Sequence, residues 1–131
     1  MESWKHNDEW RMRGADFLVS VQRHDHYEEG KHKWYVYAYI YPKHPLFVSF
    51  NEDEGIYQDA TDKLPLHCGC SLLTFHANTE GKIMSVQVGA DYLHLYDDNF
   101  ERMKNKNEAM AIFNDAEELF KTLEKMSQEA I

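Results

Sequence analysis

The chain has 131 residues, a length typical of a single domain. Its 14 basic and 23 acidic residues give a formal net charge of −9, and 43% of the residues are hydrophobic. No apolar run approaches the roughly 20 residues that span a bilayer, and the first residues lack the apolar core of a signal peptide. We therefore expect a folded cytoplasmic protein with no membrane association, and not a secreted disulfide scaffold or a generally basic nucleic-acid-binding protein.

Four segments have the residue patterns of β-strands. In residues 17–21, apolar side chains alternate with polar ones, which is typical of a half-buried strand. Residues 34–41 are bulky on both faces, which favours a central strand. Residues 71–77 and 82–90 read as two further strands, and a turn ending in Gly81 joins them into a hairpin.

The C-terminal segment has the period of an α-helix. Apolar residues recur at 4-3-4-3 spacing, at Ile112, Ala116, Leu119, Leu123 and Met126. Asn107 is placed to cap the helix N-terminus. The sequence therefore predicts an α+β fold, with an antiparallel sheet of about four or more strands and one C-terminal amphipathic helix packed on one face.

No repeat or linker divides the chain, so we expect residues 1–131 to form a single domain. Residues 1–14 are polar with scattered aromatic side chains, which is typical of a partly ordered arm. Residues 43–66 form a long acidic loop between the second and third predicted strands. A connection of this length is usually functional or mobile.

The negative charge is concentrated in the second part of the chain. Residues 51–131 hold 7 basic and 16 acidic residues, which accounts for the whole −9. The acidic segment, residues 51–62, has no Lys or Arg and five acids, which are Glu52, Asp53, Glu54, Asp59 and Asp62. Such a segment either solubilises the surface or attracts a basic partner. These five residues are therefore candidates for binding a partner protein.

Polar clusters flank three of the predicted strands. If consecutive strands alternate in direction, His44 after the second strand lies at the same sheet end as His67 before the third and Asp91 after the fourth. Loops at one end of a rigid sheet often build binding sites. The sequence therefore predicts one shared ligand pocket, with six candidate residues: His44, His67, Gly69, Asp91, His94 and Asp97.

These residue types suit two kinds of chemistry. Imidazole and carboxylate groups form general acid–base pairs, and they also bind metals, with thiolates favouring zinc. The candidate metal ligands are His67, Cys68, Cys70, Asp91 and His94, although their spacing matches no standard zinc pattern. We expect no resident cofactor, with zinc as the alternative. We expect both cysteines to be free thiols, because a disulfide between them would close a very tight ring.

The predicted central strand carries a tyrosine at every second position: Tyr35, Tyr37, Tyr39 and Tyr41. Such a row could stack a base or a nucleotide. Packing in the core or at an aromatic interface is the other interpretation.

Three short motifs precede the predicted helix in a fixed order. They are Tyr-Pro-Lys-His-Pro-Leu at 41–46, Leu-His-Cys-Gly at 66–69 and Gly-Ala-Asp-Tyr-Leu-His-Leu-Tyr-Asp at 89–97. This order resembles that of a group of small, mostly uncharacterised tailed-phage proteins, whose motifs are Gly-His-Pro-Leu, Val-His-Gly-Gly-Leu-Thr-Tyr and Gly-Phe-Asp-x-Ala-His-x-Gly-Asp. All six pocket candidates fit the pattern, whereas Lys43, Cys68 and Tyr96 replace glycines.

The resemblance implies a phage accessory protein in the bacterial host cytoplasm. Our leading hypothesis is a binding protein that inhibits a host-defence system, anti-CRISPR-like or related. The acidic segment would then face a basic groove that normally holds nucleic acid. One alternative is a sponge that sequesters a nucleotide-derived immune signal. The other is a metal-dependent hydrolase that uses His44, His67, Asp91, His94 and Asp97. We expect no direct nucleic-acid binding, and a homodimer is compatible with the sequence.

Overall fold

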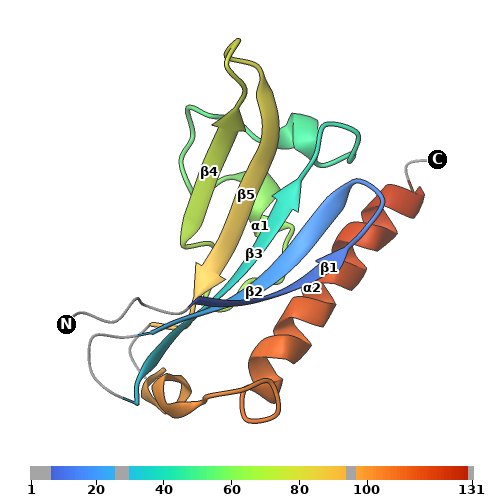
Figure 1. The fold of residues 1–131 in the computed structure, drawn as a ribbon. Coiled ribbons are helices and arrows are strands. Elements are labelled where there is room, and N and C mark those ends of the chain that lie inside the picture. Colours follow the sequence, from blue (N-terminus) through green and yellow to red (C-terminus); the bar gives the residue numbers. More distant parts are fainter. Residues whose placement is uncertain (1–6, 26–29, 94–96, 130–131) are drawn as a thin grey trace.

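The computed structural model describes residues 7–25, 30–93 and 97–129, and these form a five-stranded antiparallel sheet with a long C-terminal helix (Figure 1). The strands are β1 (Asn7–Arg13), β2 (Phe17–Asp25), β3 (His32–Ile40), β4 (Leu72–Ala77) and β5 (Ile83–Asp91). The α-helices are α1 (Asp59–Asp62) and α2 (Met110–Glu129), and the 3-10 helices are η1 (Phe47–Ser49) and η2 (Asp98–Arg102). The expected α+β fold is confirmed.

The polar N-terminal segment contributes a strand to the sheet. β1 pairs with β2 along its whole length, from Asn7 opposite His24 to Arg13 opposite Leu18. Trp10 stacks on Trp34 of β3 with ring centroids 5.7 Å apart, and this contact covers one side of β1. The expectation of a partly ordered arm is therefore wrong for residues 7–13, and residues 1–6 lie outside the described residues.

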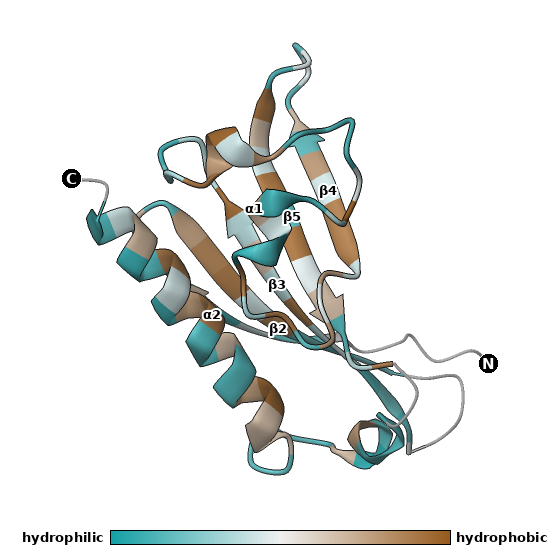
Figure 2. Ribbon diagram, turned by 180° about the vertical axis from the view of Figure 1, so that it is seen from behind, coloured by the Kyte–Doolittle hydropathy of each residue, from teal (hydrophilic) through white to brown (hydrophobic). Residues whose placement is uncertain are grey.

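The strand order β1-β2-β3-β5-β4 places β5 between β3 and β4. Since both β3 and β4 are antiparallel to β5, they run in the same direction. The connection from residue 41 to residue 71 must therefore return to the opposite end of the sheet. It carries η1 and α1 across the same face of the sheet that α2 covers (Figure 2).

The core lies between this face and α2. The apolar residues of β2, β3 and β5 that alternate toward the helix are buried, and so is the predicted helix stripe Ile112, Ala116, Leu119 and Leu123. α2 begins at Met110, three residues after the expected cap Asn107, and in the preceding turn the side-chain oxygen of Asn105 accepts the backbone N–H of Glu108 at 2.9 Å. None of the helices in the described ranges is both long and apolar enough to cross a bilayer.

The second face of the sheet carries Tyr35, Tyr37 and Tyr39 of the predicted tyrosine row, whereas Tyr41 follows the end of β3. Both α1 and α2 lie on the other face, so neither covers these rings (Figures 1 and 2). Tyr35 and Tyr37 stack with centroids 5.7 Å apart. Gly89 makes room for Tyr37, because a Cβ at position 89 would lie 2.3 Å from the tyrosine ring. We call this surface the open face.

Candidate functional site

The acidic segment borders a hollow of about 660 Å³ beside η1 and the strands β4 and β5. The lining combines carboxylates with apolar side chains, namely Glu52, Asp53, Glu54 and Asp59 with Phe47, Phe50, Phe75 and Ile83. No described residue that lines the hollow is a lysine or an arginine. This arrangement can accept a cationic group whose stem is apolar.

A buried glutamine fixes the backbone of the acidic segment. Gln58 donates from its side-chain nitrogen to the carbonyls of Gly55 at 2.7 Å and Asn51 at 3.0 Å. Its side-chain oxygen accepts the backbone N–H of Asn51 at 2.9 Å. Thr61, also buried, donates to the carbonyl of Ile56 at 2.7 Å. Residues 51–57 therefore wrap around the buried side-chain amide of Gln58 and form hydrogen bonds with it. These bonds hold in place the backbone that carries the acidic side chains.

All five predicted partner-binding acids are exposed. Four of them line the hollow, whereas Asp62 lies outside it at the end of α1. Asn51 contributes to the local turn, because its side-chain oxygen accepts the backbone N–H of Asp53 at 2.8 Å. The structure thus brings four of the five candidates to one surface.

His67 and Asp97 lie together, as the pocket prediction requires. His67 Nε2 is 2.9 Å from both carboxylate oxygens of Asp97. The Asp97 side chain is 8% exposed and that of His67 is 22% exposed, so solvent reaches the pair from the histidine side. An imidazole held by a carboxylate is a general acid–base arrangement.

The His67 ring also stacks on Tyr92, with centroids 4.2 Å apart and planes 13° from parallel. Tyr92 donates its hydroxyl to Asp115 of α2 at 2.6 Å. Burial and this hydrogen bond to a carboxylate raise the pKa of Tyr92, so the phenol stays protonated. Tyr92 therefore connects the His67–Asp97 pair to the helix.

Other predicted residues lie near this end of the sheet. Asp91 ends β5, and its carboxylate accepts the backbone N–H of Leu93 at 3.1 Å. Gly69 and Cys68 both have positive φ and are exposed. Cys70 is buried and donates its thiol to the Leu72 carbonyl at 3.2 Å, and burial raises the pKa of this thiol.

The prediction that His44 belongs to this pocket is wrong. Ile40 at the end of β3 pairs with Val86, whereas Tyr35 near the start of β3 pairs with Asp91. His44 therefore lies at the opposite end of the sheet from Asp91. Its buried ring packs edge-on against Phe17, with centroids 5.7 Å apart. The strand order is the reason, because β3 and β4 both pair antiparallel with β5 and therefore run in the same direction, whereas the prediction required them to run in opposite directions.

The predicted metal ligands are only partly described. His94 lies outside the described residues. Within residues 7–25, 30–93 and 97–129, no three His, Cys, Asp or Glu side chains form a group that could hold a metal ion. Cys68 and Cys70 are free cysteines, as expected.

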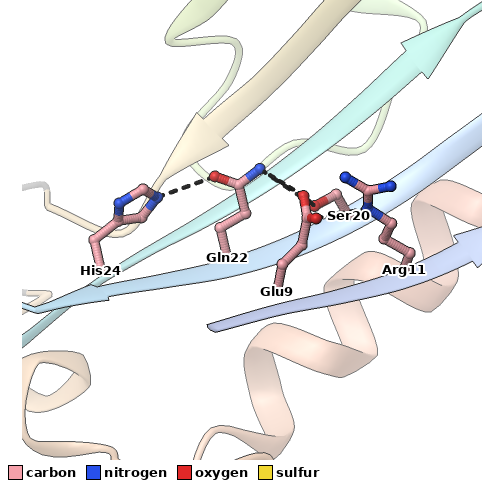
Figure 3. Close-up of polar contacts among 5 residues, drawn as sticks. All are labelled: Glu9, Arg11, Ser20, Gln22 and His24. Carbon is pink, nitrogen blue, oxygen red and sulfur yellow. Dashed lines mark hydrogen bonds and ion pairs between the residues drawn. The ribbon is translucent and has the colours of Figure 1, made fainter. Parts of the chain in front are cut away.

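A polar network on the open face was not predicted from the sequence. Glu9 accepts hydrogen bonds from Arg11 at 2.6 Å, Ser20 at 2.8 Å and Gln22 at 3.0 Å, and Gln22 in turn bonds His24 at 3.0 Å (Figure 3). Partial burial raises the pKa of Glu9, but the hydrogen bonds outweigh it and the pKa is lowered. The alternation of polar and apolar residues from position 9 to position 13 is the signal that could have revealed β1 and this network.

Besides the network on the open face, the described residues gather charged and titratable groups at the acidic hollow and at the His67–Asp97 pair. They lie toward opposite ends of the β4–β5 hairpin, since Phe75 and Ile83 of the hollow are close to its turn, whereas His67 precedes β4 and Asp97 follows β5. Comparison with known proteins finds no protein-family model, no curated protein and no solved structure that matches this chain.

Proposed function

We propose that this chain is a binding protein that captures a basic, partly apolar segment of a partner protein in the acidic hollow. The observation that carries the proposal is the pairing of exposed carboxylates with an apolar lining on a backbone fixed by Gln58. A lysine or arginine can pack its aliphatic stem on the apolar lining while its charge meets the carboxylates. A loop that is already ordered loses less conformational entropy on binding than a mobile one.

In this proposal the partner is a bacterial defence protein with a basic surface that normally holds nucleic acid. The chain would act as a phage accessory inhibitor in the host cytoplasm, anti-CRISPR-like or related, which is the setting that the motif order suggests. The net charge of −9 supports this choice of partner. It disfavours direct binding to nucleic acid and accelerates encounter with a basic surface.

The probe for a first test is a fluorescent peptide of alternating arginine and leucine residues. We expect the triple variant E52Q/D53N/E54Q to bind it at least about tenfold more weakly than the wild type at low salt, and the difference should shrink at high salt. The matched control is E108Q/E118Q/E124Q, which removes three exposed acids on or beside α2. If the control loses as much affinity as the loop variant, only the net charge matters and the hollow is not the binding site.

The His67–Asp97 pair favours a second candidate function, an acid–base hydrolase. The observation behind it is an imidazole held 2.9 Å from a buried carboxylate and reached by solvent on one side. This arrangement is suited to moving a proton to or from a bound substrate. The acidic hollow plays no part in that reaction, so the two candidate functions make opposite predictions for the same variants.

A further inference from the structure

β1 is an edge strand with one neighbour. Within the described part of the chain it pairs only with β2, so the outer row of its backbone N–H and C=O groups faces away from the sheet. It has seven residues, contains no proline or glycine, and pairs with β2 without a bulge. Such an edge is a template for a further strand unless its side chains prevent pairing.

The side chains of β1 carry opposite charges along its length. On the open face, Glu9 precedes Arg11 and Arg13, and all three are exposed. A run of like charges would repel a second copy of the strand. Opposite charges separated along one strand instead attract a second copy that runs antiparallel, because the acidic part of one strand then meets the basic part of the other.

One register satisfies both the backbone and the charges. With Trp10 opposite Trp10 of a second copy, Asn7 lies opposite Arg13, so every residue of β1 has a partner on the other strand. Each Glu9 then lies opposite an Arg11. A shift by two residues in either direction places Glu9 opposite Glu9 or Arg11 opposite Arg11, and a shift by one residue turns the two open faces to opposite sides.

The other side of β1 offers an apolar contact in the same register. A groove of about 450 Å³ runs between β1 and α2 and is lined by Trp10, Met12 and Phe113. Met12 is 38% exposed, and Trp10 is only partly buried although it contacts Phe113 edge-on at 5.3 Å. A second β1 would bring its own Trp10 and Met12 to the mouth of this groove and remove apolar surface from water.

We propose that two copies of this chain associate through β1, antiparallel and with Trp10 at the two-fold axis, so that their sheets join into one. We choose a second copy as the partner of this edge because, in the antiparallel register, each Glu9 of one β1 lies opposite an Arg11 of the other. An isologous contact of this kind closes after two subunits, so the product is a dimer and not a fibre. The open faces of the two sheets become continuous.

The test uses analytical ultracentrifugation in the presence of a reducing agent, so that the exposed Cys68 cannot cross-link the chains. We expect the wild type to dimerise with increasing concentration, and R11E and E9R each to dimerise at least about tenfold more weakly, because each variant places like charges opposite each other twice. An equimolar mixture of R11E and E9R should restore the dimer, since every pair is then of opposite sign. The control K82E changes the net charge as R11E does, on the far hairpin, and should dimerise like the wild type.

A second measurement needs no substitution and covers the case in which a variant fails to fold. Hydrogen exchange of the wild type should slow in β1 as the concentration rises, while exchange in β4, the other edge, should not change. The proposal is overturned by a wild type that stays monomeric, by a dimer that neither R11E nor E9R weakens, or by exchange in β1 that is independent of concentration. The variant E52Q/D53N/E54Q should still dimerise, so this result is separate from that for the acidic hollow.

Discussion

His44 donates from Nε2 to the backbone carbonyl of Leu123 at 2.8 Å and accepts the backbone N–H of Leu46 at Nδ1, at 3.0 Å. The first bond connects the segment after β3 to the C-terminal half of α2, and the second holds the ring against the backbone of its own segment. Since Nδ1 accepts a hydrogen bond, the proton of the neutral ring must be on Nε2. Every polar atom of this buried ring is thus satisfied, which gives His44 a structural role.

Replacing His44 by alanine should lower the free energy of unfolding by about 2–4 kcal/mol, because it opens a cavity and leaves the buried N–H of Leu46 without its acceptor. Urea denaturation followed by circular dichroism measures the change. The control is His76→Ala, at an exposed position on β4, which should cost less than about 1 kcal/mol. Equal effects of the two changes would show that the His44 contacts do not stabilise the fold.

The apolar stripe of α2 gives a second stability prediction. Leu119 and Leu123 are 0% exposed, so Leu119→Ala or Leu123→Ala should each lower the free energy of unfolding by roughly 2–5 kcal/mol. Met110, which is 59% exposed at the start of the same helix, is the control, and Met110→Ala should change little. If Leu123→Ala leaves the melting temperature unchanged, α2 is not packed on the sheet in solution.

Local patterns in the sequence predicted four of the five strands and the long C-terminal helix, but not the order of the strands in the sheet. Alternation and helical period depend only on neighbouring residues, so four strands and the buried face of α2 were predictable. β1 was missed because its alternation is short and lies in a polar context. The insertion of β5 between β3 and β4 depends on how residues 41–71 cross the sheet, and no local pattern encodes that path.

The same distinction explains the outcome for the candidate site. His67 precedes β4 and Asp97 follows β5, and these strands form one hairpin, so their meeting follows from pairing between neighbours in sequence. His44 follows β3, and the long connection of residues 41–71 separates β3 from the β4–β5 hairpin along the chain, so its position could not be predicted in this way. The hollow was not predicted either, because it combines the acidic segment with Phe75 and Ile83 from a distant hairpin.

His24 predicts a pH dependence of stability. Its partial burial, together with the positive charge of Lys33, holds its pKa below the ordinary value of 6.5, while Asp25 and Glu9 oppose this more weakly. The unfolded chain therefore takes up a proton at this histidine at a higher pH than the folded chain. The contribution of the neutral ring is fully present above pH 6.5 and is lost as the pH falls below that value.

We expect the difference in unfolding free energy between the wild type and His24→Gln to become smaller between about pH 7.5 and about pH 5.5. Chemical denaturation of both proteins at several pH values measures it. Comparing the two proteins at each pH cancels the contributions of the other histidines. A difference that stays constant or grows toward acid would contradict the assigned direction of the His24 pKa.

Gln58 should control the order of the acidic segment. Gln58→Ala removes three hydrogen bonds to the loop backbone and should lower the free energy of unfolding by about 1–3 kcal/mol. A glutamate-specific protease should then cleave after Glu52 or Glu54 faster in the variant than in the wild type. Gln128→Ala, at an exposed position on α2, is the control. Unchanged cleavage in Gln58→Ala would show that the loop does not depend on this side chain.

The last prediction separates the binding protein from the hydrolase. His67→Gln removes the imidazole while keeping a hydrogen-bond donor for the buried Asp97, so the fold should survive. For a binding protein, this change should leave the association rate with the arginine–leucine peptide within about twofold of the wild type. E52Q/D53N/E54Q should slow association about tenfold or more, with the effect weakening as salt screens the exposed charges.

A hydrolase requires the reverse, namely loss of ester or phosphoester hydrolysis in His67→Gln and no effect of the loop variant. Stopped-flow association and hydrolysis of nitrophenyl esters and phosphates, measured on both variants, decide between them. Full peptide binding by the loop variant together with hydrolysis that depends on His67 would place the function at the His67–Asp97 pair and not at the acidic hollow.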